Sequence, residues 1–176
     1  ITGSVDIAAG STITITGLTG TQTVDGTLTV TSSPADVFTS NEGTWAKSAG
    51  TLTLTVASGG LSAGTTCTVS FEVQNGDSAQ GNARTVVISG TVEVGTHDSA
   101  IGDHTLTSDT GDLMGVTGGA GPLLLVAGEF QDGGVGQSSP LVSSSNTITV
   151  NITGSVDIAA GSTITITGLT GTQTVD

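Results

Sequence analysis

The residues best suited to chemistry gather in one glycine-rich segment, residues 95–121. Four aspartates lie in this segment, at positions Asp98, Asp103, Asp109 and Asp112. Carboxylate oxygens on a flexible loop are ligands that Ca²⁺ prefers. Their spacing matches neither an EF-hand loop nor the nonapeptide calcium repeat. We therefore expect a solvated acidic loop, with structural Ca²⁺ at these four aspartates as the alternative.

Two histidines in the same segment stand beside aspartates. His97 precedes Asp98, and His104 follows Asp103. A catalytic triad needs a nucleophile and a base held in a defined geometry, which sequence neighbours alone do not provide. Ser99 lacks the G-x-S-x-G context of a nucleophile elbow. We expect surface histidines, no catalytic residue and no cofactor-binding residue, so the chain is not predicted to be an enzyme.

Asn151 opens the sequon Asn151-Ile152-Thr153, the signal for attachment of an N-linked glycan. The sequon falls in an alternating segment in which Asn151 is expected to face outward. The sequence predicts a glycosylation site there, with an ordinary strand asparagine as the alternative.

Cys67 is the only cysteine, so no disulfide can form within the chain. It alternates with polar residues and shares one strand face with Val69, Phe71 and Val73. A buried cysteine behaves as a small hydrophobic residue, and this is what we expect of Cys67.

The charge balance excludes several kinds of partner. Fifteen carboxylates face only two lysines and arginines, which gives a formal net charge of −13. Such a chain repels nucleic acid and anionic membranes. It contains no apolar run long enough to cross a bilayer. We expect no nucleic-acid partner and no direct membrane insertion by this segment.

Strict alternation of polar and apolar residues dominates the chain. In a strand, successive side chains point to opposite faces, so the apolar set enters a core while threonine faces water. Continuous apolar runs at 86–88 and 123–126 suit strands covered on both faces, or contacts between modules. The alternating segments, which we predict to be strands, are 12–16, 27–31, 51–56, 66–73 and 147–153.

The turns and strands together predict an all-β, antiparallel β-sandwich. Glycine-containing turns separate the strands at the spacing typical of such domains. Residues 7–15 resemble residues 61–69, as expected for two similar halves packed face to face. We assign residues 1–94 to the back portion of one module, 95–121 to a loop or linker, and 122–176 to the front strands of the next module.

The chain contains one long internal repeat. Residues 1–25, ITGSVDIAAGSTITITGLTGTQTVD, recur letter for letter as residues 152–176, at an offset of 151 residues. Identity over that length indicates a tandem array with a 151-residue unit. The partners expected for such a module are neighbouring copies of the same repeat.

Four segments together carry a resemblance to a known class of repeats: SSPLVSSSNTITVNI, DIAAGSTITITGLTG, GTLTLTVASGGLSAGTTCTVSFEV and ARTVVISGTV. They resemble the tandem immunoglobulin-like β-sandwich repeats of giant extracellular surface and filament proteins of algae and other microbes, either mastigoneme-like or adhesin-like. The resemblance covers residues 122–176 and 1–94. It implies an extracellular or cell-surface, extended and non-catalytic array. The Cys…Trp…Cys framework of antibody domains is absent.

These observations lead to one expected function and one alternative. We expect a structural repeat module of an extracellular filament or surface appendage, assembled head to tail, without a cofactor unless Ca²⁺ binds. The alternative is a stalk repeat of a large cell-surface adhesin. We expect contacts between modules or copies to involve Trp45, Val87 and Leu123–Leu125, each of which could instead be core.

Overall fold

The computed structural model describes residues 1–94 and 97–174. The described residues form strands, turns and bends and contain no helix, and every strand pairing among them is antiparallel. The all-β antiparallel prediction is therefore confirmed. The strands are β1 (Thr12–Thr16), β2 (Gly26–Ser33), β3 (Phe38–Ala46), β4 (Thr51–Val56), β5 (Thr68–Phe71), β6 (Val87–Val94), β7 (His97–Thr105), β8 (Phe130–Gln137) and β9 (Ile148–Gly154).

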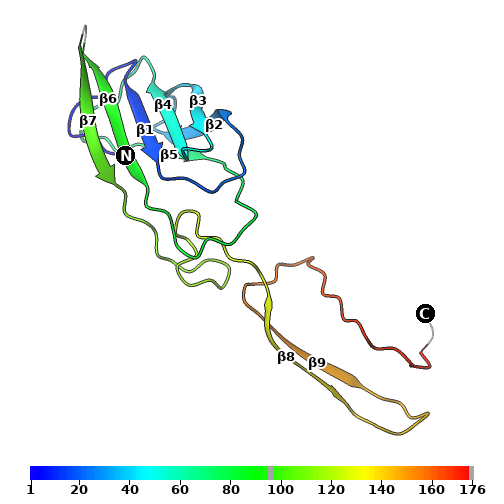
Figure 1. Ribbon diagram of the computed structural model, residues 1–176. Helices are drawn as coiled ribbons and strands as arrows, with labels where there is room; N and C mark the ends of the chain where they lie inside the picture. Colours follow the sequence, from blue (N-terminus) through cyan, green and yellow to red (C-terminus); the bar gives the residue numbers. More distant parts are fainter. Residues whose placement is uncertain (95–96, 175–176) are drawn as a thin grey trace. The chain divides into compact units, whose positions relative to one another are not determined.

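The chain divides into two compact units. The first unit comprises residues 1–113 and 117–127, and the second comprises residues 114–116 and 128–176. The first unit is one curled seven-stranded sheet with the strand order β5-β2-β3-β4-β1-β6-β7 (Figure 1). Because β1 lies between β4 and β6, the N-terminal segment supplies a central strand of this sheet.

Strand β1 shows how the threonine alternation produces this sheet. Ile13 and Ile15 are buried, while Thr12, Thr14 and Thr16, which alternate with them, are only half-buried. Ile13 lies opposite Leu54 of β4, and Ile15 lies opposite Leu52. Leu52 and Leu54 are fully buried, so the apolar sides of neighbouring strands meet in one core.

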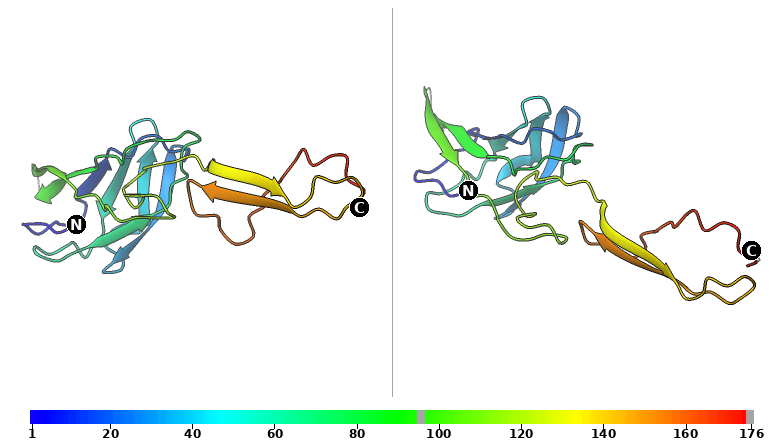
Figure 2. Two further views of the ribbon diagram at one scale, coloured as in Figure 1. Left: turned by 90° about the horizontal axis from the view of Figure 1, so that it is seen from below. Right: turned by 60° about the horizontal axis from the view of Figure 1, so that its bottom comes forward.

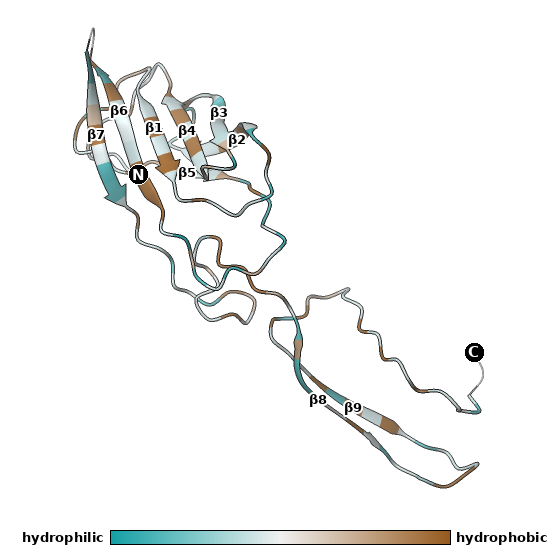
Figure 3. Ribbon diagram, in the orientation of Figure 1, coloured by the Kyte–Doolittle hydropathy of each residue, from teal (hydrophilic) through white to brown (hydrophobic). Residues whose placement is uncertain are grey.

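The buried core residues of the first unit come from β1, β2, β3, β4 and β6 and from segments between strands. Figure 3 shows the apolar stretches within β1, β4 and β6. Trp45 is buried, and its indole N–H donates a hydrogen bond of 3.0 Å to the Thr23 carbonyl oxygen. It therefore lies in the core, and our expectation that it forms a contact between modules is wrong. The buried hydrophobic residues are Ile7, Ile13, Ile15, Leu18, Val30, Val37, Phe38, Trp45, Leu52, Leu54, Val56, Leu61, Cys67, Val86 and Val92.

The structure corrects two local expectations. Residues 97–105 form β7, which pairs with β6, so this part of the segment 95–121 is not a loop; residues 95–96 lie outside the described residues. The apolar run 123–126 forms no regular strand. Leu125 makes a single antiparallel bridge to Gln80, and Leu123 packs partly buried against the core.

The second unit contains only β8 and β9, paired as a two-stranded ribbon. Their register runs from Gln137 opposite Ile148 to Phe130 opposite Gly154, with a bulge between Phe130 and Asp132. All eight residues of β8 are exposed. The views of Figure 2 show coil after β9, which is the segment whose sequence repeats residues 1–25.

In the part of the chain that the structure describes, no helix has the length and apolar character needed to cross a membrane.

Candidate interaction surface

One 25-residue sequence occupies two different environments in this protein. We call residues 1–25 the first copy and residues 152–176 the second copy, of which residues 152–174 are described. We call residues 26–106 the acceptor, because the first copy packs and pairs against strands from this range.

The first copy is held by its apolar side chains. Four of them belong to the core, and each contributes about 1.5–3 kcal/mol through burial. The acceptor therefore depends on the first copy for a substantial part of its core. The four residues, with their exposed fractions, are Ile7 (3%), Ile13 (2%), Ile15 (5%) and Leu18 (8%).

Hydrogen bonds hold the first copy along its whole length. Ile1 exchanges two backbone hydrogen bonds with Cys67, of 2.8 and 2.7 Å. Ile7 exchanges two with Leu61, both of 2.8 Å. The buried Ser11 hydroxyl accepts a hydrogen bond of 2.9 Å from the Glu93 amide. The strand pairings of β1 follow these contacts, and after β1 the Leu18 amide donates a hydrogen bond of 2.9 Å to the Gly50 carbonyl oxygen. The segment is therefore an integral part of the sheet.

In the second copy the same side chains are exposed to solvent. Every described residue from Asp157 onward is exposed, including the counterparts of the four core residues. Within the described ranges, hydrogen bonds connect this copy to the chain outside it only near its start, for example from the Asp157 amide to the Met114 carbonyl oxygen at 2.9 Å. The exposed counterparts are Ile158 (50%), Ile164 (41%), Ile166 (53%) and Leu169 (51%).

The backbone of the second copy nevertheless repeats that of the first. The Ser11 amide donates to the Ala8 carbonyl oxygen at 3.2 Å, and the Ser162 amide donates to that of Ala159 at 3.1 Å. The glycines at equivalent positions adopt the same left-handed conformation, which only glycine enters freely. These pairs are Gly10 and Gly161 (φ 85° and 86°), Gly17 and Gly168 (93° and 88°), and Gly20 and Gly171 (93° and 82°).

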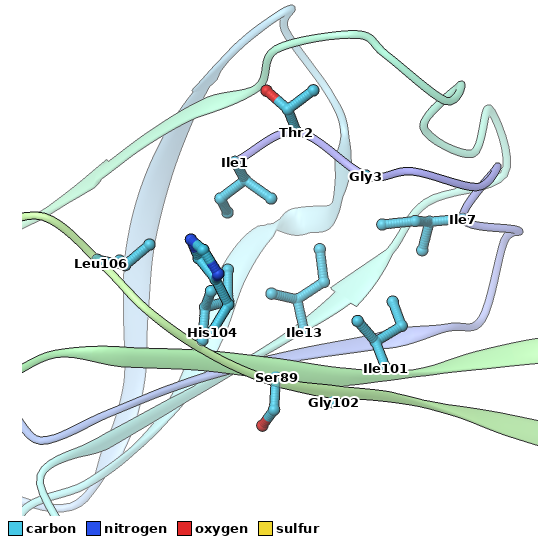
Figure 4. A pocket seen from close by; sticks show the side chains of 11 residues that line it. Ile1, Thr2, Gly3, Ile7, Ile13, Ser89, Ile101, Gly102, His104 and Leu106 are labelled. Carbon is cyan, nitrogen blue, oxygen red and sulfur yellow. The ribbon is translucent and has the colours of Figure 1, made fainter.

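An apolar pocket of about 360 Å³ adjoins the start of the first copy. Figure 4 shows Ile7, Ile13 and Ile101 pointing into it, with His104 and Leu106 on another side. Its lining lacks a cluster of charged groups, so it is suited to an apolar side chain. The full lining is Ile1, Thr2, Gly3, Ile7, Ile13, Ile88, Ser89, Ile101, Gly102, His104 and Leu106.

The four aspartates proposed as Ca²⁺ ligands are distributed over two elements. Asp98 and Asp103 lie in β7. In the loop that follows, Asp109 accepts a hydrogen bond of 2.8 Å from the Gly111 amide, and Asp112 accepts one of 3.0 Å from Gly118. Among residues 1–94 and 97–174, no three or more His, Cys, Asp or Glu side chains converge as a metal site would require.

The other singled-out residues show no convergent chemistry. His97 and His104 are exposed on β7, and His104 contributes to the pocket lining. Asn151 is exposed in β9, and its glycosylation remains a prediction. Cys67 is fully buried and unpaired, which confirms the expectation for this residue. Desolvation by burial raises the pKa of its thiol, while the nearby N-terminal ammonium of Ile1 acts in the opposite direction.

The repeat is evident in the sequence, but the exposure of the apolar residues in its second copy was not predicted. Ile158, Ile164, Ile166 and Leu169 form an exposed apolar series, with exposed fractions of 41–53%. Their signal is present in the sequence, since each matches a residue predicted to face the core. The fold thus defines an all-β protein with an unpartnered, strand-forming segment. No family model, no curated protein and no solved structure matches the chain.

Proposed function

We propose that this protein is a structural, non-catalytic repeat module of an extracellular filament or surface appendage, assembled head to tail with copies of itself. The observation that carries this proposal is the exact repetition of residues 1–25 at 152–176, combined with the opposite burial of the two copies. A sequence that is buried in its first copy and solvent-exposed in its second is expected where one module ends and the next begins.

The fold supports this proposal in a general way. The curled antiparallel sheet, its β1 partners and the threonine-rich strands are consistent with an immunoglobulin-like β-sandwich as the repeating module. Short antiparallel strands with buried apolar faces form a compact core that could serve as the repeating unit. Repetition of such modules would give an extended array.

The composition agrees with an exposed, extended material. With a formal net charge of −13, successive modules repel one another at a distance, which keeps an array extended and soluble. Salt screens this repulsion, and the Debye length is about 8 Å at physiological ionic strength. Attachment between modules must then come from short-range apolar and backbone contacts.

Electron microscopy of the native material tests this function. Antibodies raised against the purified chain should label filaments or appendages on intact source cells, with a regular axial period set by one module or a small multiple. A label confined to single-chain stalks would favour the adhesin alternative. A label on dispersed, aperiodic protein, or only inside the cells, would overturn the proposal.

A further inference from the structure

We propose that the second copy is the donor segment for the acceptor of another copy of this chain, in which it takes the place that residues 1–25 occupy here. This inference rests on the proposed head-to-tail function and names the interaction that would perform it. Three independent features of the structure support it: the identity of the side chains, the preformed backbone and the free hydrogen-bonding edge of β9.

The side chains and backbone already match the acceptor. Residues 152–176 are identical to the segment that fills the acceptor core. The second copy carries the left-handed glycines and the Ala159–Ser162 turn of the first copy. A segment that holds its bound conformation beforehand loses less conformational freedom on binding.

The hydrogen-bonding pattern of β9 leaves its other edge available. In an antiparallel pair, directly opposite residues alternate between hydrogen-bonded and non-hydrogen-bonded pairs. The Ser138 amide donates to the Thr147 carbonyl oxygen, so the alternation makes Ile152 and Gly133 a non-hydrogen-bonded pair. The backbone groups of Ile152 consequently point away from β8.

The same backbone groups are used in the first copy. Ile1, the counterpart of Ile152, directs its backbone nitrogen and its carbonyl oxygen to Cys67 of the acceptor. The carbonyl oxygen of Gly3, the counterpart of Gly154, accepts a hydrogen bond of 2.9 Å from Gly64. Strand β9 can therefore pair with β8 on one edge and with another copy's acceptor on the other edge.

Two pockets indicate what else this docking would bury. Gly3, Ile7 and Ile13 line the pocket of the first unit, and their counterparts line a pocket of about 390 Å³ in the second unit. In the second unit the opposing wall includes Phe130, which lies across from Gly154 in the β8–β9 pair. When the second copy takes the place of residues 1–25 in the acceptor of another chain, Phe130 lies beside the pocket shown in Figure 4. Phe130 is 58% exposed in the present chain.

The equivalent residues Ile13 and Ile164 allow a matched test in the full chain. Ile13→Asp prevents insertion of the first copy, and Ile164→Asp prevents insertion of the second. Trp45 is the only tryptophan and lies in the acceptor core, so its fluorescence reports whether the acceptor is folded. Light scattering coupled to size-exclusion chromatography reports association over a hundred-fold range of concentration.

The wild type, the two single variants and the double variant should differ in the burial of Trp45 and in their association. The wild type and Ile164→Asp should show a buried Trp45. Ile13→Asp should also keep Trp45 buried, and it should form dimers and longer chains whose fraction rises with concentration. The variant carrying both substitutions should lose the native Trp45 signal. If Ile13→Asp is as unfolded as the double variant, the inference is overturned. A folded but strictly monomeric Ile13→Asp chain overturns the exchange between copies.

Phe130 provides a second readout that does not require unfolding. In the Ile13→Asp background, Phe130→Asp should weaken association at least tenfold, whereas Val142→Asp should change it less than twofold. Val142 is 94% exposed and is the control for adding a charge at an exposed apolar site. Equal effects of the two substitutions would contradict the assignment of Phe130 to the pocket. Failure of these tests would leave the labelling of native filaments unaffected, so the inference and the proposed function can fail separately.

Discussion

Leu54→Ala measures how much the folded acceptor depends on the packing beneath β1. Leu54 is 0% exposed and lies opposite Ile13 of β1 and Gly43 of β3. The side chains of Leu52 and Leu54 occupy the space that a Cβ on Gly43 would need, each with a methyl group 2.7 Å from that position. The glycine therefore allows the two leucines to pack closely over β3.

The expected cost follows from the atoms that are removed. Leucine to alanine deletes three carbons, which costs about 2.4 kcal/mol at roughly 0.8 kcal/mol per buried methylene. Incomplete collapse of the cavity adds about 1 kcal/mol at roughly 24 cal/mol per Å³ of remaining volume. We expect the free energy of unfolding to fall by about 3–4 kcal/mol, within the roughly 2–5 kcal/mol typical of buried leucines.

Urea denaturation followed by Trp45 fluorescence measures this change, with the slope of the transition as a check that the denatured state is comparable. Leu141→Ala is the matched control, because Leu141 is 72% exposed and its removal should cost less than about 0.5 kcal/mol. A loss below about 1 kcal/mol for Leu54→Ala, or one equal to the control, would refute the packing described here.

Three further predictions concern the thiol, the turn after β1 and Ca²⁺. Burial raises the pKa of Cys67 above the ordinary value of 9.0, so the folded chain keeps a proton that the unfolded chain loses. The Cys67 thiol should therefore leave the free energy of unfolding unchanged at lower pH and reduce it as the pH rises past 9.0. Urea titrations of Cys67→Ala at the same pH values should lack this decline. Gly17→Ala should lower the unfolding free energy by at least about 1–2 kcal/mol, because alanine is strained at positive φ and its Cβ would meet the Thr85 carbonyl oxygen. Gly168→Ala has open space and should leave acceptor stability unchanged; both are measured with Ile164→Asp present, and equal losses would contradict the assignment. Scanning calorimetry should give the same midpoint with millimolar Ca²⁺ as with a chelator, and a Ca²⁺-dependent rise would show that the aspartates bind the ion.

The strands that alternate strongly were predictable from the sequence. Segments 12–16 and 51–56 coincide with β1 and β4, because each places its apolar residues on one buried face. Prediction failed where a strand has little apolar face to bury. Strand β7 lies at a sheet edge with almost every residue exposed, and β8 is exposed throughout, so neither carries the alternation that marks a core strand.

Strand β3 was missed for a different reason. It contributes Phe38 and Trp45 to the core, but its register shifts between Phe38 and Gly43, which interrupts the period of two. The run 123–126 was misinterpreted because continuous apolar character does not distinguish a strand from a segment that packs against a core.

The sequence predicts the repeated segment of the candidate interaction surface, but it does not predict that the second copy is exposed. The repeat at 152–176 is evident from the letters alone, and so is its threonine–isoleucine pattern. That Ile164 is exposed while Ile13 is buried depends on which strands are present beside each copy. That information is long-range, since the acceptor strand β6 lies more than 70 residues from β1.

The most direct test of the account is a chain in which residues 1–176 are followed by a second copy of residues 26–127. Trp45→Phe in the first acceptor leaves only the tryptophan of the added acceptor as a probe. We predict the blue-shifted emission of a buried indole, which Ile164→Asp should abolish because residues 152–176 then no longer complete the added sheet. A solvent-exposed emission that is the same with and without Ile164→Asp would contradict the claim that this segment links one module to the next.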